Sequence, residues 1–218
     1  MSVSTPASTE NQPETLSGAQ IVVRLLERQG IGVVAGIPGG AILPFYDALS
    51  ETDKIHHVLA RHEQGAGFMA QGMARATGKP AVCIASSGPG ATNLLTAIAD
   101  AKLDSIPIVA ITGQVPKAMI GTDAFQEVDT YGLSIPITKH NFLVSSAEEL
   151  LEVIPRAFTL AASGRPGPVL VDIPKDVQNQ RIEVKEWPAP GLPEPAPAFD
   201  VAAIDQALAM IEQPERPI

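Results

Sequence analysis

Apolar residues recur along the chain with two alternating periods, and this alternation predicts the secondary structure. Short runs that are apolar throughout predict buried strands, whereas longer runs with apolar positions three and four residues apart predict helices. The expected strands cover residues 32–36, 55–59, 81–86, 106–112, a segment within 136–144, and PVLVDIP at 168–174. The expected helices cover residues 17–30, 41–49, 62–76, GATNLLTAIADAK at 90–102, and 146–163. The pattern predicts an α/β domain with a mainly parallel six-stranded sheet and helices on both faces.

Polar residues and a glycine mark the ends of two of these helices. Ser17 and Gln20 have the spacing of a capping box, and Gly30 is placed to end the helix that they begin. Ser146 and Glu149 have the same spacing and predict the start of the last helix of the domain.

The composition divides the chain into four parts. Residues 1–15 are polar and rich in Pro, Ser and Thr, without the basic start and apolar centre of a signal peptide, so they predict a disordered tail. Residues 16–183 form the α/β domain, and residues 184–198 contain the Pro-rich linker WPAPGLPEPAP. The amphipathic run AAIDQALAMIEQ within residues 199–218 is expected to open a second, truncated domain.

The overall composition is that of a folded protein with an acidic surface. Apolar residues make up 45% and charged residues 18% of the 218 residues, enough for one sizeable core. The net charge of -9 argues against a nucleic-acid partner, which would need a basic surface. No apolar run reaches the roughly 18 residues of a membrane span, so no membrane partner is expected. The lone Cys83 is expected to be a buried thiol, consistent with a cytoplasmic location.

One connection in the predicted fold is too long to be a simple turn. It runs from Gly113 to Pro136, and connections of that length in compact domains usually carry function. It contains Gln114, Phe125 and Gln126, which favour a site over a flexible tether.

Three glycine-rich turns follow predicted strands, namely GIPGG at 36–40, HEQGAG at 62–67 and SSGPGATN at 86–93. In an open α/β sheet such turns gather at the carboxyl edge, where ligands bind. Each turn taken alone is equally consistent with glycines that serve tight turns or close helix packing. None matches the dinucleotide or nucleoside-triphosphate motifs.

Glu63 stands out among the charged residues. It lies at the predicted start of a helix directly after a strand, followed by small residues that would let another surface approach. One interpretation is an ordinary first-turn carboxylate favoured by the helix dipole. The other is a carboxyl that, buried against a ligand, exchanges a proton near neutral pH.

Seven motifs, in this order and spacing, resemble the amino-terminal domain of acetolactate synthase large subunits, a family of thiamine-diphosphate enzymes. The motifs are GIPGG, LARHEQGAGFMAQGMARATGKP, SSGPGATN, ITGQVP, IGTDAFQEVDTYG, ITKHN and SGRPGPVLVDIPKD. The second and third would indicate only the wider thiamine-diphosphate superfamily. The run GTDAFQEVDTYG followed by ITKHN points to acetolactate synthase.

The resemblance implies roles for particular residues. Glu63 matches the catalytic glutamate that hydrogen-bonds the pyrimidine ring of thiamine diphosphate. The positions that match residues lining the cofactor or the reacting centre are Gly39, Pro89, Asn93 and Gln126. Phe125 and Lys139 match the wall and mouth of the substrate pocket, to which Gln126 also contributes. Arg165 matches an arginine that contacts FAD.

The resemblance also implies a reaction and partners. Pyruvate loses carbon dioxide and is joined to a second 2-keto acid, pyruvate or 2-ketobutyrate, on the way to branched-chain amino acids. The site is expected to be shared between subunits of a homodimer or tetramer, with a possible small regulatory subunit. Mg²⁺ would be held by a GDG motif and an Asn-Asn pair, which this sequence lacks, so no metal ligand is expected in this chain. The chain alone is therefore expected to be inactive, with exposed apolar patches around HEQGAG and GTDAFQE.

Two other kinds of function are consistent with parts of the sequence. Other members of the superfamily, such as sulfoacetaldehyde acetyltransferase or pyruvate oxidase, remain an alternative, whereas a glyoxylate carboligase would be expected to lack Glu63. A non-catalytic interaction module of the same fold would have little reason to retain Glu63, Gln126 and Lys139 together.

Overall fold

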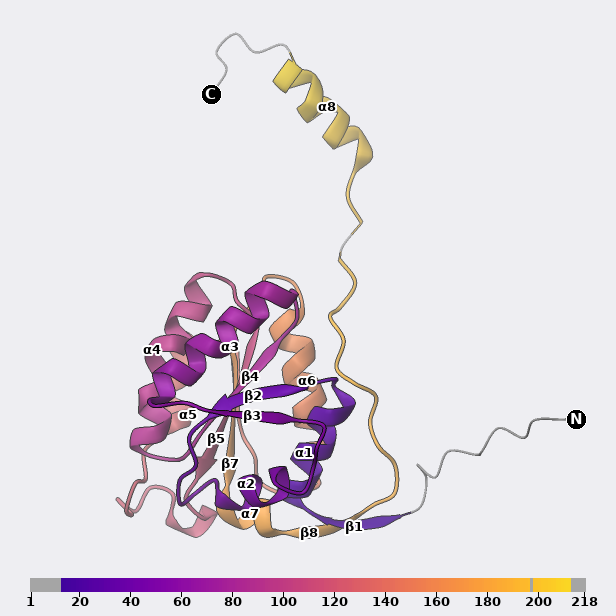
Figure 1. Cartoon of the computed structure of the whole chain (residues 1–218). Coiled ribbons are helices and arrows are strands. Elements are labelled where there is room, and N and C mark those ends of the chain that lie inside the picture. Colours follow the sequence, from indigo (N-terminus) through magenta and orange to yellow (C-terminus); the bar gives the residue numbers. More distant parts are fainter. Residues whose placement is uncertain (1–12, 197, 213–218) are drawn as a thin grey trace, which may run out of the picture.

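A six-stranded parallel sheet forms the centre of the protein (Figure 1). The computed structural model describes residues 13–196 and 198–212. The strands of this sheet are β2 (Val33–Gly36), β3 (His56–Leu59), β4 (Ala81–Ala85), β5 (Ile108–Gln114), β6 (His140–Leu143) and β7 (Val169–Pro174). Their order is β3-β2-β4-β5-β7-β6, and every neighbouring pair is parallel. The predicted parallel sheet is confirmed.

The central strands are apolar because helices cover both of their faces. Every residue of β4, β5 and β7 is buried, which explains why these strands lack the alternation of a half-exposed strand. The helices and 3-10 turns are α1 (Gly18–Arg28), α2 (Leu43–Leu49), α3 (Glu63–Thr77), α4 (Pro89–Leu103), η1 (Lys117–Met119), α5 (Thr130–Ser134), η2 (Ile135–Ile137), α6 (Leu150–Ala162) and α7 (Lys175–Asn179). One core cluster joins α1, α2 and α6 to the sheet, and a second joins α3 and α4 to its other face.

Small residues bring α3 and α4 unusually close together. A Cβ atom added at Gly67 would lie 2.5 Å from the Cβ of Ala97, closer than two carbon atoms can pack. The buried Gln71 side chain donates from Nε2 to the Ala97 carbonyl at 2.8 Å, which ties the two helices together at the same level. The first turns of α3 and α4 are therefore held in a fixed relation.

The helix-end signals in the sequence were correct at α1 and only partly correct at two other helices. Ser17 and Gln20 form the predicted capping box, and Gly30 follows α1 with a φ of +78°. Ser146 accepts from the Glu149 amide at 3.3 Å, but this hydrogen bond stabilises a turn that precedes the helix. Helix α6 itself begins at Leu150. Helix α2 begins two residues later than expected, with a proline in its first turn.

Two short strands that the sequence pattern did not predict lie beside the main domain. Strands β1 (Glu14–Ser17) and β8 (Arg181–Val184) pair antiparallel. Strand β1 begins at Glu14, inside the expected tail, and β8 ends at Val184, the first residue of the expected linker, while the division into domains stays a prediction. Each strand has only four residues and buries only part of them, so the apolar signal was weak. The remainder of the expected tail, residues 1–12, and residues 213–218 of the expected second domain lie outside the described residues.

The first half of the Pro-rich segment is fastened to the domain. The Gln29 side chain and the Gly191 backbone exchange two hydrogen bonds of 2.7 and 2.8 Å, and Trp187 packs against the core. Helix α8 (Val201–Glu212) has no buried residue and stands away from the layered domain in Figure 1. Within residues 13–196 and 198–212 no helix is long and apolar enough to cross a membrane.

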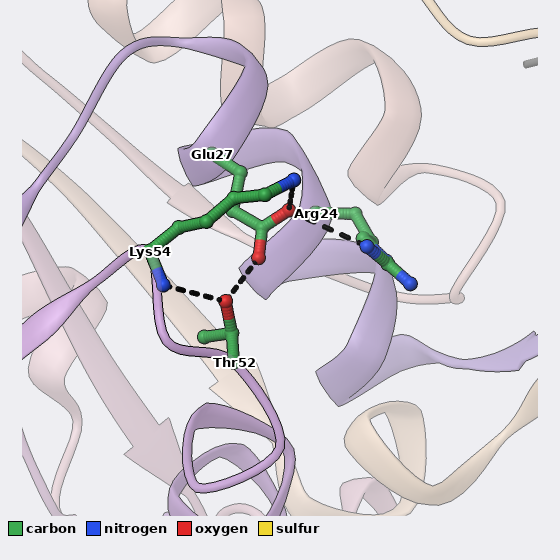
Figure 2. Close-up of polar contacts among 4 residues, drawn as sticks. All are labelled: Arg24, Glu27, Thr52 and Lys54. Atoms are coloured by element: carbon green, nitrogen blue, oxygen red, sulfur yellow. Dashed lines mark hydrogen bonds and ion pairs between the residues drawn. The ribbon is translucent and has the colours of Figure 1, made fainter.

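A cluster of charged residues around the half-buried Glu27 connects α1 to the segment between α2 and β3 (Figure 2). The Glu27 side chain is only 7% exposed and accepts from the Thr52 hydroxyl at 2.5 Å and from Lys54 Nζ at 3.3 Å. Arg24 lies 3.5 Å from the same carboxylate. Burial by itself would raise the pKa of Glu27, but these hydrogen bonds and the two positive charges lower the pKa below its usual value.

Replacing the hydroxyl in this cluster should destabilise the fold. A hydrogen bond to a charged group contributes about 1.5–3 kcal/mol, so Thr52→Val should lower the free energy of unfolding at pH 7 by roughly that amount. Because the lowered pKa of Glu27 stabilises the fold only while the carboxyl is ionised, the difference should shrink as the pH falls through that pKa. Urea unfolding at pH 7 and pH 3 measures both effects. Thr77→Val, at an exposed hydroxyl, is the control and should change stability by no more than about 0.5 kcal/mol.

Candidate functional site

The carboxyl edge of the sheet carries most of the residues expected to form a site. The turns and helix starts that follow β2, β3, β4 and β5 all lie at this edge. Six of the predicted residues belong to these segments: Gly39, Glu63, Pro89, Asn93, Phe125 and Gln126. The structure thus brings together residues that are up to 87 positions apart in the sequence, as expected for a parallel sheet.

Glu63 is the first residue of α3, and its carboxylate faces the first turns of α4. Oε2 accepts a hydrogen bond from Asn93 Nδ2 at 2.9 Å. A Cβ atom added at Gly90 would lie 3.6 Å from Oε1. His62 precedes the helix and caps it by accepting from the Gln64 amide at 3.1 Å. The half-buried carboxylate therefore sits where two helix amino termini favour negative charge.

The turn after β2 is pressed against the end of β4. A Cβ at Gly39 would lie 2.5 Å from the Cβ of Ser86, so only glycine fits there. The Ser86 hydroxyl accepts from the Ala41 amide at 3.3 Å and fixes the same turn. Gly39 thus allows the turn after β2 to pack directly against the Ser86 side chain.

The long connection after β5 folds back onto the turn between β4 and α4. Gly88 has a φ of +55°, and a Cβ there would lie 2.6 Å from the Gln126 carbonyl oxygen. Gln126 itself has a left-handed φ of +58°. Phe125 is 87% exposed beside it. Phe125 and Gln126 are therefore presented at the edge next to Pro89.

Exposed apolar side chains gather near the two expected motifs. Phe68 and Met69 on α3 and Phe125 on the long connection are all exposed. This agrees with the apolar patches expected around HEQGAG and GTDAFQE.

Tyr46 lies close to the site and was missed in the sequence. Its hydroxyl is 3.2 Å from His57 Nε2, and the two rings meet edge to face with centroids 5.0 Å apart. Burial, together with the negative charge of Glu63, raises the pKa of Tyr46 well above its usual value. Burial lowers the pKa of His57. A neutral phenol therefore stands near the Glu63 carboxylate, and the sequence carried no motif that signalled it.

Lys139 and Arg165 lie at the opposite edge of the sheet from Glu63. Lys139 precedes β6 and donates from Nζ to the carbonyls of Leu160 and Ser163. Arg165 precedes β7 and donates to the Ser105 hydroxyl at 2.7 Å. The expected grouping of Lys139 with Phe125 and Gln126 is therefore not assembled within this chain.

The two basic residues instead share a hollow of about 420 Å³. Its lining also includes Lys102 and Glu194. The pKa of Lys139 is lowered chiefly by burial and further by Lys102, while Glu194 acts in the opposite direction. The hollow is thus lined by three basic side chains and one carboxylate.

One lysine that does lie at the carboxyl edge is Lys175, the first residue of α7. It follows β7 directly and is half-buried. Residues that directly follow a parallel strand lie at the ligand-binding edge of the sheet. The position of Lys175 could therefore have been predicted from the motif SGRPGPVLVDIPKD.

A buried carboxyl, Asp172, lies behind the long connection and was also not singled out from the sequence. It is 1% exposed and accepts from the Thr112 hydroxyl at 2.6 Å and from Gln114 Nε2 at 3.0 Å. Burial raises its pKa to about 7, with a smaller contribution from the negative charge of Asp129 and opposed by the two hydrogen bonds. No cluster of three or more His, Cys, Asp or Glu side chains that could hold a metal ion occurs in the described parts of the chain.

Residues 16–133 match a family described as the thiamine pyrophosphate enzyme, N-terminal TPP binding domain. The chain belongs to this family. It is 62% identical over 212 residues to the acetolactate synthase isozyme 1 large subunit of Escherichia coli K12, covering 97% of this chain and 38% of that protein. It is 56% identical over 203 residues to the isozyme 2 large subunit of the same organism, covering 93% and 36%.

A relative with lower identity also matches nearly the whole of this chain. The acetolactate synthase large subunit of Corynebacterium glutamicum is 51% identical over 221 residues, covering 98% of this chain and 35% of that protein. The chain thus spans little more than a third of the length of these curated relatives.

The carboxyl edge of this TPP-binding domain fits the pyrimidine end of thiamine diphosphate. Within residues 13–196 and 198–212, Glu63 Oε2 accepts from Asn93, while Oε1 accepts no hydrogen bond. Oε1 is therefore available to a donor or proton-sharing nitrogen of a ligand. The close packing at Gly39 leaves no room for a Cβ atom at that position.

The raised pKa of Asp172 predicts a specific pH dependence of stability. Between about pH 4 and pH 7 the folded protein holds a proton on Asp172 that the unfolded chain has lost. The stabilisation by the protonated form is fully present below the ordinary pKa of 3.8 and is lost as the pH rises through about 7. The unfolding free energy of the wild type should therefore fall by about 1.4 kcal/mol per pH unit relative to Asp172→Asn across this window. Urea unfolding of both proteins at several pH values checks this, and a pH-independent difference would contradict it.

Proposed function

We propose that this chain supplies the pyrimidine-binding part of an acetolactate synthase large subunit. The reaction would join two 2-keto acids, pyruvate with pyruvate or 2-ketobutyrate, and release one carbon dioxide. The observation that carries the proposal is the Glu63 carboxylate, held by Asn93 with its second oxygen available at the carboxyl edge. Identity of 51% to 62% with large subunits of this name supports the assignment of the reaction.

Bound thiamine diphosphate would supply a nucleophilic carbon that adds to the keto group and makes decarboxylation possible. The part of this chain is to hold and polarise the pyrimidine. Glu63 would share a proton between Oε1 and a ring nitrogen, and Asn93 would keep the carboxylate turned toward that nitrogen. Gly39 and Pro89 would line the same edge without obstructing it. Phe125 and Gln126 would cover the reacting centre and keep water away from it.

The remaining parts of the proposal concern groups beyond this edge. Mg²⁺ and the diphosphate would be held outside this chain, and a homodimer or tetramer would bring the two halves of the site together. The basic hollow of Lys102, Lys139 and Arg165 is suited to the phosphates of FAD, so Arg165 would contact the flavin from the amino edge. A small regulatory subunit and a cytoplasmic location belong to the same proposal.

Exchange of the domain into an active relative tests the function. Residues 16–184 would replace the corresponding part of the Escherichia coli isozyme 1 large subunit, and acetolactate formation from pyruvate would be measured with thiamine diphosphate, Mg²⁺ and FAD. We expect activity in the chimera and a fall of about 10² to 10⁴ in turnover for Glu63→Gln, because the amide cannot share the proton. The thermal midpoint should be almost unchanged.

Glu152→Gln is the matched control, since Glu152 is an exposed carboxylate paired only with Arg156 one helical turn away. This variant should turn over pyruvate like the unmodified chimera. Near-normal turnover of Glu63→Gln in an active chimera would contradict the catalytic assignment of Glu63.

A further inference from the structure

A single buried side chain closes the neck of the long connection after β5. Gln114 donates from Nε2 to the Val128 carbonyl at 3.0 Å and accepts at Oε1 from the Val115 amide at 2.8 Å. Residues 115 and 128 are the two ends of the connection, so one amide group binds both. The segment 115–128 is here called the neck-closed loop.

Asp172 holds the Gln114 amide in the orientation that allows this. The second Nε2 hydrogen of Gln114 is donated to Asp172 Oδ2 at 3.0 Å, and Thr112 holds the other carboxyl oxygen at 2.6 Å. Thr112 and Asp172 face each other on the neighbouring strands β5 and β7. The carboxyl is therefore held between two interior strands of the sheet.

Two residues before Val128, the neck-closed loop presses on the turn that begins α4. The Gln126 backbone lies against Gly88, in contact so close that a Cβ on the glycine could not fit. Asp123 and Gln126 both have left-handed φ angles, +55° and +58°, a conformation that costs free energy in residues other than glycine. Glu127 accepts from the Gly121 amide at 3.3 Å inside the loop. The surroundings must hold this strained conformation in place.

We propose that Gln114 and Asp172 are positioning residues that hold the neck-closed loop, and with it Phe125 and Gln126, against the β4–α4 turn. Gln114 acts directly on both ends of the loop, and Asp172 acts through Gln114. The consequence for catalysis rests on the proposed function, whereas the control of loop order is a property of this chain alone.

The chain offers a matched pair of variants for the test. Thr112 and Gln114 each donate one hydrogen bond to Asp172, but only Gln114 reaches the loop. Thr112→Val and Gln114→Met each remove one hydrogen bond to Asp172 and nearly conserve the volume of the side chain. The two variants therefore lose the same kind of buried hydrogen bond at Asp172. Only Gln114→Met should release the neck-closed loop.

Amide hydrogen exchange of the full chain measures this release. The reporters are the amides of Gly121 and Glu127, which bond within the loop and do not touch Gln114. We expect at least tenfold faster exchange at both in Gln114→Met and near wild-type exchange in Thr112→Val. Asp172→Asn should also stay near wild type, because its amide can accept from Gln114 and donate to Thr112.

Unchanged exchange in Gln114→Met, or equal acceleration in Thr112→Val, would overturn the proposal. Should Gln114→Met fail to fold, Gln114→Asn, which keeps the amide but cannot span the neck, replaces it in the same comparison. In the active chimera, Gln114→Met should lower kcat/KM for pyruvate about tenfold while Thr112→Val leaves it within twofold. Faster loop exchange with unchanged kcat/KM would leave the loop mechanism standing and count against the proposed function.

Discussion

The close approach of α3 and α4 is the constraint on which the site depends. Glycine and alanine at the contact let the two helices pack without intervening side chains, as the clash expected at Gly67 shows. Their first turns consequently converge, and Glu63 comes within 2.9 Å of Asn93. A larger residue at the contact would separate the helices and with them the carboxylate and the amide that orients it.

The edge around this pair is organised by close contacts at two glycines. Gly39 against Ser86 and Gly88 against Gln126 bring three turns together after β2, β4 and β5. At each glycine another residue, Ser86 or Gln126, occupies the space that a Cβ atom would need. At this edge one carboxylate, that of Glu63, has a defined direction.

Much of this arrangement could be predicted from the sequence because the relevant signals are local. Continuous apolar runs indicated the buried strands, and the residues directly after them, including Glu63 and Asn93, could be assigned to the carboxyl edge. Long-range pairing could not be predicted in this way. The contact of Asp172 with Thr112 depends on the register between β5 and β7, and strands β1 and β8 are too short to show a period. Lys139 was grouped with Phe125 by motif resemblance alone, although its place before β6 puts it at the opposite edge.

The central claim is that Glu63 directs one carboxyl oxygen at the pyrimidine ring while Asn93 holds the other. A crystal structure of the active chimera with bound thiamine diphosphate tests it most directly. We expect Glu63 Oε1 within about 2.7–3.2 Å of a pyrimidine ring nitrogen, with the Asn93 to Oε2 hydrogen bond retained. A pyrimidine ring bound away from Glu63, or a Glu63 side chain turned into solvent, would contradict the account.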